Sequence, residues 1–318
     1  MKTLIVVSGG DASGINTTIA RYTRRAQQFG DEVLGAVGGF AGVLANHFRP
    51  IELPLVRLLE GSGGSYLPSS REPVLGRPEA QAGLRTIMAE NQIDNILLFG
   101  GDGTLRHVLP LLKQWHIPVI ALPTTIDNDV AGTERTLGFD TACNFAYASI
   151  AGALATAHAL AGRIFMIETL GGDRGYLALE IAFATGAHAV LLPEYAFEIG
   201  WLADRLKQAI ANDGFALAVI CEGVAAAHPT LPEEVSRQTG IRMRYIQLGH
   251  AQRGGAVSHL DRRLATEMAY LAYDGFRAGV TTGAIIVENG LTRLQPGTLP
   301  AEERLQPDYA RYQVVNGL

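Results

Sequence analysis

The stretch NILLFGGDGT at residues 95–104 decides the fold, because a short apolar run passes directly into Gly-Gly-Asp-Gly-Thr. The run has the length of a β-strand, and its continuous hydrophobicity is typical of a strand covered on both faces in a parallel sheet. The glycines let the backbone turn tightly, and the N–H groups of the turn and of a following helix can bind an anion. The stretch therefore predicts a buried strand, an anion-binding turn and a helix, in that order.

The same alternation continues along the chain. Apolar runs of strand length occur at 4–8, 95–100, 119–122, 164–168, 189–192, 217–222, 244–249 and 284–289. Apolar residues spaced three and four apart predict helices within 15–26, 105–112 and 202–210. Alternating strands and helices indicate an α/β fold, in which ligands bind at the carboxyl ends of the strands. With 318 residues, the chain can form one large domain or two moderate ones.

Charge and composition limit the partners and the compartment. A net charge of -5 argues against a nucleic-acid partner. The long uncharged stretch 143–161 is mostly alanine with several polar residues, so we expect a core or subunit-interface helix and no membrane association. Two cysteines without metal-ligand spacing suit a reducing compartment, and we expect a cytoplasmic protein.

Gly-Gly-Asp follows an apolar run three times, in SGGDASG (8–14), FGGDGT (99–104) and LGGDRG (170–175). A single short glycine motif is most simply an ordinary strand-to-helix turn. Three of them at comparable strand ends favour anion binding by backbone N–H groups.

A pair of carboxylates follows another apolar run. In TIDND (125–129), Asp127 and Asp129 flank Asn128 and must repel each other unless a cation or a proton lies between them. Phosphoryl transfer needs a cradle for the donor phosphates, Mg²⁺, and a base beside the acceptor hydroxyl. Asp102 is a candidate Mg²⁺ ligand. The candidate cradle consists of Gly100, Gly101, Gly103 and Thr104. Taken alone, the two carboxylates are more simply explained as the caps of a turn.

Basic residues gather late in the chain. LGHAQRGG (248–255) contains His250 and Arg253, and Arg244 lies on the apolar run before it. Arginine binds phosphate bidentately and histidine adds a donor, so the segment predicts a phosphate-ester pocket. An exposed basic turn with a core histidine is the alternative, just as Arg71 could be a solvated surface charge.

Together, GGDGT at 100–104, TIDND at 125–129 and GHAQRGG at 249–255 resemble, in order and spacing, the motifs of the bacterial-type 6-phosphofructokinases. The resemblance covers the chain from its first strand to the strand expected at 284–289. It implies two Rossmann-like lobes with mostly parallel sheets. The implied ATP-binding lobe comprises residues 1–138 and 251–300, and the implied sugar-phosphate-binding lobe comprises residues 139–250 and 301–318.

The resemblance also implies roles for individual residues. Asp127 matches the base that activates the sugar 1-hydroxyl, with Thr125, Asp129 and Arg71 completing the catalytic set, and Asp102 and Asp129 match Mg²⁺ ligands. The implied nucleotide-binding residues are Gly10, Phe40, Arg71, Gly100, Gly101, Asp102, Gly103 and Thr104. The implied acceptor-binding residues are Thr125, Asp127, Arg163, Leu170, Gly171, Gly172, Glu222, Arg244, His250 and Arg253.

Arg163 and Arg244 match arginines that, in the family, reach the site from a neighbouring subunit. Self-association is therefore expected, at least as a homodimer and typically as a homotetramer.

The expected activity is transfer of the γ-phosphoryl of ATP to the 1-hydroxyl of fructose 6-phosphate, giving fructose 1,6-bisphosphate in glycolysis. Two departures from the family leave alternatives open. Gly172 stands where the family has arginine, so tagatose 6-phosphate and sedoheptulose 7-phosphate are alternative acceptors. Gly103 matches ATP users, whereas Thr124 matches neither ATP users nor pyrophosphate users, so pyrophosphate is the alternative donor. A catalytically quiet sugar-phosphate sensor is the alternative of another class.

Overall fold

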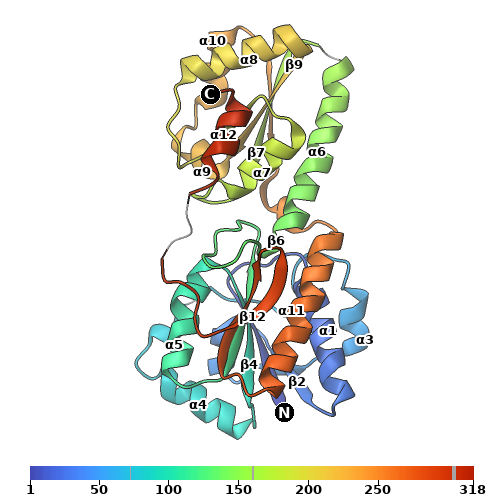
Figure 1. Cartoon of the computed structure of the whole chain (residues 1–318), viewed down its shortest axis with the longest axis vertical. Helices are drawn as coiled ribbons and strands as arrows, with labels where there is room; N and C mark the ends of the chain where they lie inside the picture. The colour runs from blue at the N-terminus through green and yellow to red at the C-terminus, as the bar shows by residue number, and fades with distance from the viewer. Residues whose placement is uncertain (72, 160, 303–305) are drawn as a thin grey trace. The chain divides into compact units, whose positions relative to one another are not determined.

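A computed structural model describes residues 1–71, 73–159, 161–302 and 306–318 (Figure 1). The chain divides into two compact units, Met1–Thr141 with Arg253–Arg304, and Ala142–Gln252 with Leu305–Leu318. Both units alternate strands with helices, so the expected α/β fold is confirmed. The assignment of ATP to one unit and of sugar phosphate to the other stays a prediction.

The first unit is built on a mixed sheet with the strand order β12-β11-β5-β4-β1-β2-β3. Its strands are β1 (Lys2–Ser8), β2 (Glu32–Ala36), β3 (Phe48–Pro50), β4 (Asn95–Gly100), β5 (Val119–Thr125), β6 (Leu137–Gly138), β11 (Thr282–Glu288) and β12 (Leu291–Pro296). The inner strands run parallel, and the edge strands β3 and β12 pair antiparallel to their neighbours. The short strand β6 pairs with β5 off this path.

Helices cover both faces of this sheet, which explains its continuous hydrophobicity. Ile5 and Val7 of β1 pack in one core with α1 (Ile15–Gln28), α3 (Leu53–Leu58) and α11 (His259–Arg277). Leu4 and Val6, which point the other way, pack in a second core with α2 (Gly39–Leu44), α4 (Ala80–Glu90) and α5 (Leu109–Gln114). Two short turns complete the unit, the 3-10 turn η1 (Val74–Gly76) and the π-turn η2 (Thr104–Val108).

The chain reverses its winding direction at β1. From β1 it crosses to β2 on one side, and β4 then pairs with β1 on the other, with Ser8 opposite Gly100. The turns that follow β1 and β4 are therefore neighbours at the carboxyl edge of the sheet. Ligands of open α/β sheets bind at such a switch point.

The second unit is built on a four-stranded parallel sheet with the order β10-β7-β9-β8. Its strands are β7 (Arg163–Thr169), β8 (Ala189–Leu191), β9 (Phe215–Cys221) and β10 (Met243–Gln247). The helices that follow or flank them are α6 (Phe139–Ala159), α7 (Tyr176–Thr185), α8 (Ile199–Asp213), α9 (Glu222–Ala227), α10 (Leu231–Thr239), η3 (Gly249–Arg253) and α12 (Tyr309–Asn316). None of the helices in the described part of the chain combines the length and apolarity needed to cross a membrane.

Candidate functional site

A cavity of about 290 Å³ opens in the first unit where β1, β4 and β5 end. The residues that line it come mainly from the turns after these three strands, and two come from elsewhere in the unit. They are Gly9, Gly10, Arg71, Gly101, Asp102, Gly103, Thr104, Thr124, Thr125, Asp127, Asp129 and Arg253. Residues far apart in the sequence thus surround one small, mostly polar space.

The glycine turn after β4 is held against β1 by a threonine. Thr104 Oγ1 lies 3.3 Å from the carbonyl oxygen of Ser8 and 3.2 Å from Ser8 Oγ, within hydrogen-bonding distance of both. A Cβ on Gly100 would lie 2.5 Å from the Cβ of Thr104, so only glycine allows this approach. The motif therefore fixes a turn whose backbone N–H groups border the cavity.

Two guanidinium groups converge beside the first glycine turn. A Cβ on Gly10 would lie 3.2 Å from Arg71 Nη2 and 3.3 Å from Arg253 Nη1. Ser69 Oγ donates to the carbonyl of Gly9 at 2.7 Å, which ties the loop carrying Arg71 to the turn after β1. Like charges gathered in one cavity indicate an anion site.

The resemblance assigns both Arg253 and His250 to acceptor binding, and the structure shows Arg253 lining this cavity. Its Nη1 donates to the carbonyl of Asp11 at 3.4 Å and lies beside Arg71 in the first unit. His250 belongs to the second unit and does not line this cavity. The assignment of Arg253 and His250 to acceptor binding stays a prediction.

Three carboxylates line the cavity, from Asp102, Asp127 and Asp129. Asp102 Oδ2 forms an ion pair with Arg106 Nη1 at 3.2 Å. Asp102 Oδ1 is buried and has no hydrogen-bond partner within the described ranges. A buried carboxylate oxygen that points to no protein donor suits a cation or an ordered water.

Asn128, which the sequence reasoning passed over, shapes the carboxylate pair. Its backbone is left-handed, with φ of 52°, and its side chain is buried. Its Oδ1 accepts from the N–H of Thr136 at 2.9 Å, and its Nδ2 donates to the carbonyl of Glu134 at 3.3 Å. Asparagine tolerates this backbone better than most residues, and its place between two aspartates after a strand is the signal that could have identified it.

The cavity suits Mg²⁺ in its chemistry but is not a closed protein cage. No three His, Cys, Asp or Glu side chains form a metal-binding cluster in the described part of the chain. Mg²⁺ is usually held by only one or two carboxylates, with phosphates and waters as its other ligands. The buried Oδ1 of Asp102 fits that pattern, and the metal itself stays a prediction.

Two residues of the expected nucleotide set do not line the cavity. Phe40 is 4% exposed and packs in the core beside Leu4 and Leu98, so it offers no aromatic face to a nucleotide. Gly100 is the last residue of β4 and lies beneath the turn. Thr124, which matches neither ATP users nor pyrophosphate users, lines the cavity. Its hydroxyl donates to the carbonyl of Leu122 at 2.8 Å.

The second unit brings together a different group at the carboxyl ends of its strands. Leu170, Gly171 and Gly172 follow β7, Glu222 follows β9, and His250 follows β10. Glu222 Oε1 accepts from the N–H groups of Gly171, at 2.9 Å, and Gly172, at 2.6 Å. The turn LGGDRG is therefore not a vacant anion cradle, because a carboxylate of the same unit already binds its N–H groups.

Arg163 and Arg244 are not brought to this group. Arg163 is the first residue of β7, and Arg244 is paired with Phe165, one position from the start of β10. At about 3.3 Å per residue, Arg163 and Leu170 are separated by roughly 20 Å along the strand. The two arginines therefore lie toward the amino ends of the strands, whereas Glu222 and His250 follow the carboxyl ends.

A sequence model of the family described as Phosphofructokinase matches residues 2–276. The chain belongs to the phosphofructokinase family. A phosphofructokinase relative from Persephonella marina, named ATP-dependent 6-phosphofructokinase, is 33% identical over 320 residues, covering 99% of this chain and 98% of the relative. The bacterial-type membership expected from the three motifs is thus confirmed.

Solved phosphofructokinase structures share the fold. The phosphofructokinase of Saccharomyces cerevisiae superposes with a TM-score of 0.84 at 23% identity, over 93% of this chain and 44% of the yeast chain. A pyrophosphate-dependent phosphofructokinase from Marinobacter aquaeolei gives a TM-score of 0.81 at 20% identity, over 96% of this chain and 85% of that one. Similarity at these identities establishes the architecture and does not choose the phosphate donor.

Proposed function

We propose that this phosphofructokinase transfers the γ-phosphoryl of ATP to the 1-hydroxyl of fructose 6-phosphate, giving fructose 1,6-bisphosphate, a step of glycolysis. One observation carries the proposal: a glycine turn, two guanidinium groups and the Asp127–Asp129 pair line a single cavity. The name of the Persephonella marina relative supports ATP as the donor. A sensor would have no use for this combination, because binding alone requires neither a base nor a metal ligand.

Each part of the cavity has a task in phosphoryl transfer. The N–H groups of the turn after β4 bind donor phosphates, and Arg71 and Arg253 stabilise the charge of the phosphoryl in flight. Asp127 accepts the proton of the 1-hydroxyl as that oxygen attacks the γ-phosphorus and ADP leaves. Mg²⁺, when bound, would neutralise phosphate charge, and Asp102 and Asp129 would hold it.

The open space at Gly172 also suits a second candidate acceptor. A Cβ at Gly172 would meet no atom within 4 Å, so the position where the family has arginine is open space. A longer or differently configured ketose phosphate, such as sedoheptulose 7-phosphate or tagatose 6-phosphate, could use that space. We retain fructose 6-phosphate as the principal acceptor because the named relative is a 6-phosphofructokinase.

We also propose that the enzyme works in the cytoplasm as a homo-oligomer, typically a tetramer. Arg163 and Arg244 lie away from Glu222 and His250, so one chain does not gather all the cations assigned to the sugar phosphate. A second copy that presents them would complete the pocket. Measuring the mass in solution, with and without fructose 6-phosphate, tests this part.

An assay that crosses ATP and pyrophosphate against the three ketose phosphates tests the donor and the acceptor. We expect turnover with ATP and fructose 6-phosphate. Turnover with pyrophosphate alone would overturn the donor, a clear preference for another ketose phosphate would overturn the acceptor, and no turnover on any pair would favour the sensor.

The Asp127→Asn variant tests the base. It should lower turnover by about 10²- to 10⁴-fold while leaving sugar-phosphate binding intact, because the amide keeps the size but cannot accept the proton. Asp204→Asn is the matched control, since that carboxylate is 83% exposed and pairs only with Lys207 among the described residues. An Asp127→Asn enzyme as fast as the control would refute the assignment.

A further inference from the structure

The first three N–H groups of the loop after β7 donate to side chains and not to backbone carbonyls. The N–H of Leu170 donates to Gln252 Oε1 at 2.9 Å, and the N–H groups of Gly171 and Gly172 donate to Glu222 Oε1. Three successive N–H groups thus end on two side-chain oxygens. Gly171 and Gly172 have φ of 135° and 59°, which glycine adopts readily, and the Gly171 carbonyl accepts from the N–H of Arg174 at 3.0 Å.

Gln252 is the buried member of this arrangement. It is 1% exposed, and its Nε2 donates to the carbonyl of Ala142 at 3.4 Å, the longer of its two bonds. Leu170 is itself 5% exposed, so water cannot readily replace Gln252 as the acceptor of its N–H. One amide therefore fixes the first N–H of the loop and anchors to the segment that begins the second unit.

Gln252 also joins two of the turns that end at this edge of the sheet. It lies two residues after His250 in η3, which follows β10, and its partner Leu170 follows β7, the neighbour of β10. Glu222, after β9 on the other side of β7, holds the next two N–H groups of the same loop. Moving Leu170 would therefore move Gly171 and Gly172 relative to both Glu222 and His250.

We propose that Gln252 is a positioning residue for the sugar-phosphate acceptor: it sets the 170–172 loop and so determines how tightly the acceptor binds. This inference rests on the proposed function and on the acceptor-binding residues that the resemblance implies in this unit, among them Leu170, Gly171, Gly172, Glu222 and His250. Gln252 need not touch the substrate. Its effect passes through the position of the Leu170 N–H and of the two N–H groups that follow it.

The test compares Gln252→Leu, which removes both bonds, with Gln252→Glu, which keeps an oxygen acceptor for the Leu170 N–H. The matched control is Asn316→Leu, because Asn316 is also a fully buried amide of the second unit, bonded to the N–H and carbonyl of Val190 in β8. Steady-state kinetics and amide hydrogen exchange over 170–172 are measured on the full-length enzyme. Thermal denaturation follows the loss of stability in each variant.

Gln252→Leu should raise the KM for fructose 6-phosphate about tenfold or more, with the KM for ATP and kcat changed less than about threefold. It should also speed hydrogen exchange at Leu170, Gly171 and Gly172. Gln252→Glu should recover much of the exchange protection and of the KM. Asn316→Leu should lower the melting temperature without moving either quantity.

Three outcomes would overturn the proposal. One is a folded Gln252→Leu enzyme with the wild-type KM for fructose 6-phosphate, and another is a control that raises this KM as much. The third applies if Gln252→Leu does not fold: Gln252→Glu then decides, and loss of protection at 170–172 without any change in KM refutes the role. If the wild type transfers no phosphoryl group, the proposed function fails, and sugar-phosphate binding by calorimetry tests Gln252 separately.

Discussion

At the scale of single residues, the side-chain hydrogen bonds of Asn128 hold the turn that carries Asp127 and Asp129. Asn128→Gly keeps a residue that accepts the left-handed φ of 52° but loses the bonds to Glu134 and Thr136. We expect a loss of about 1–3 kcal/mol in the free energy of unfolding, because the buried partners lose their bonds, and a fall in kcat/KM. Denaturant unfolding and steady-state kinetics measure the two effects.

Asn128→Ala separates the backbone from the side chain. It loses the same bonds and adds the cost of a left-handed alanine, about 1–2 kcal/mol. The alanine variant should therefore be less stable than the glycine variant. Equal stability of wild type and Asn128→Gly would show that these hydrogen bonds do not hold the turn.

The residue scale also shows where sequence reasoning stopped. Asp127 and Asp129 alone would be most simply explained as turn caps, and their roles were predicted only because TIDND occurs together with GGDGT and GHAQRGG. The partners of Asn128 could not be, since Glu134 and Thr136 lie in irregular chain that no periodicity describes. Phe40 was matched to the family's aromatic position from the sequence alone. In the structure its ring packs in a core between α2 and the sheet, and the sequence does not show this burial.

At the scale of elements, all four strands of the second sheet were predicted, whereas β2 and the edge strands β3 and β12 of the first sheet were not. Strand β12 has an exposed, alternating pattern, and its only strong signal is the turn at Asn289 and Gly290, whose φ values of 51° and 72° suit a tight hairpin. The helix expected over 105–112 is divided into η2 and α5. Pro110, the second residue of α5, cannot donate to the carbonyl four residues earlier, and a π-helical turn precedes α5.

A capping serine gives an element-scale prediction for α11. Ser258 Oγ accepts from the N–H of Asp261 at 3.2 Å, at the start of a helix that packs along α1. Ser258→Ala should cost about 1 kcal/mol of unfolding free energy, whereas Ser258→Gly should cost only a few tenths. Urea unfolding of the two variants checks the difference. An alanine variant as stable as the glycine variant would mean that the cap is not what starts the helix.

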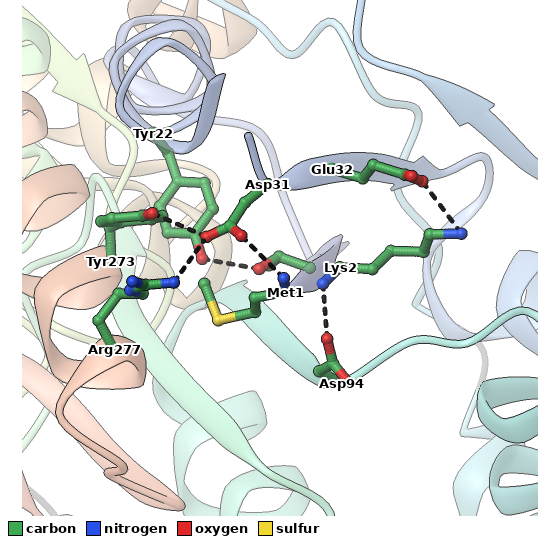
Figure 2. Close-up of polar contacts among 9 residues, drawn as sticks. Met1, Lys2, Tyr22, Asp31, Glu32, Asp94, Tyr273 and Arg277 are labelled. Carbon is green, nitrogen blue, oxygen red and sulfur yellow. Dashed lines mark hydrogen bonds and ion pairs between the residues drawn. The ribbon is translucent and has the colours of Figure 1, made fainter. Parts of the chain in front are cut away.

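At the scale of the whole molecule, residues from distant parts of the sequence surround one carboxylate of the first unit, that of Asp31. Figure 2 shows Asp31 among Met1, Tyr273 and Arg277. The Met1 amine lies 2.8 Å from Asp31 Oδ1, the Tyr273 hydroxyl donates to Oδ2 at 2.7 Å, and Arg277 Nη1 lies 3.7 Å from Oδ2. Met1 and Asp31 are thus joined to α11, which follows nearly all of the second unit in the sequence.

This cluster predicts how stability responds to acid. Burial opposes ionisation of Asp31, but hydrogen bonds from the Met1 amine and Tyr273, with the charge of Arg277, hold the pKa of its carboxyl below the ordinary value. Because the folded pKa is lowered, the contribution is full above the unfolded pKa of about 3.9 and is lost as the pH falls through the folded value. The melting temperature of Asp31→Asn should lie below that of wild type at neutral pH, and the gap should close in acid.

The same cluster predicts a second loss in alkali. Burial, aided by the hydrogen bond to Asp31, raises the pKa of Tyr273 to about 12. A raised pKa favours the neutral phenol in the folded state, so its contribution is full below the unfolded pKa of about 10 and is lost as the pH rises toward the folded value. Above about pH 10, the melting temperature of Tyr273→Phe should therefore fall less steeply with pH than that of wild type. If Asp31→Asn and Tyr273→Phe both ran parallel to wild type across the whole pH range, this cluster could not be what ties α11 to the start of the chain.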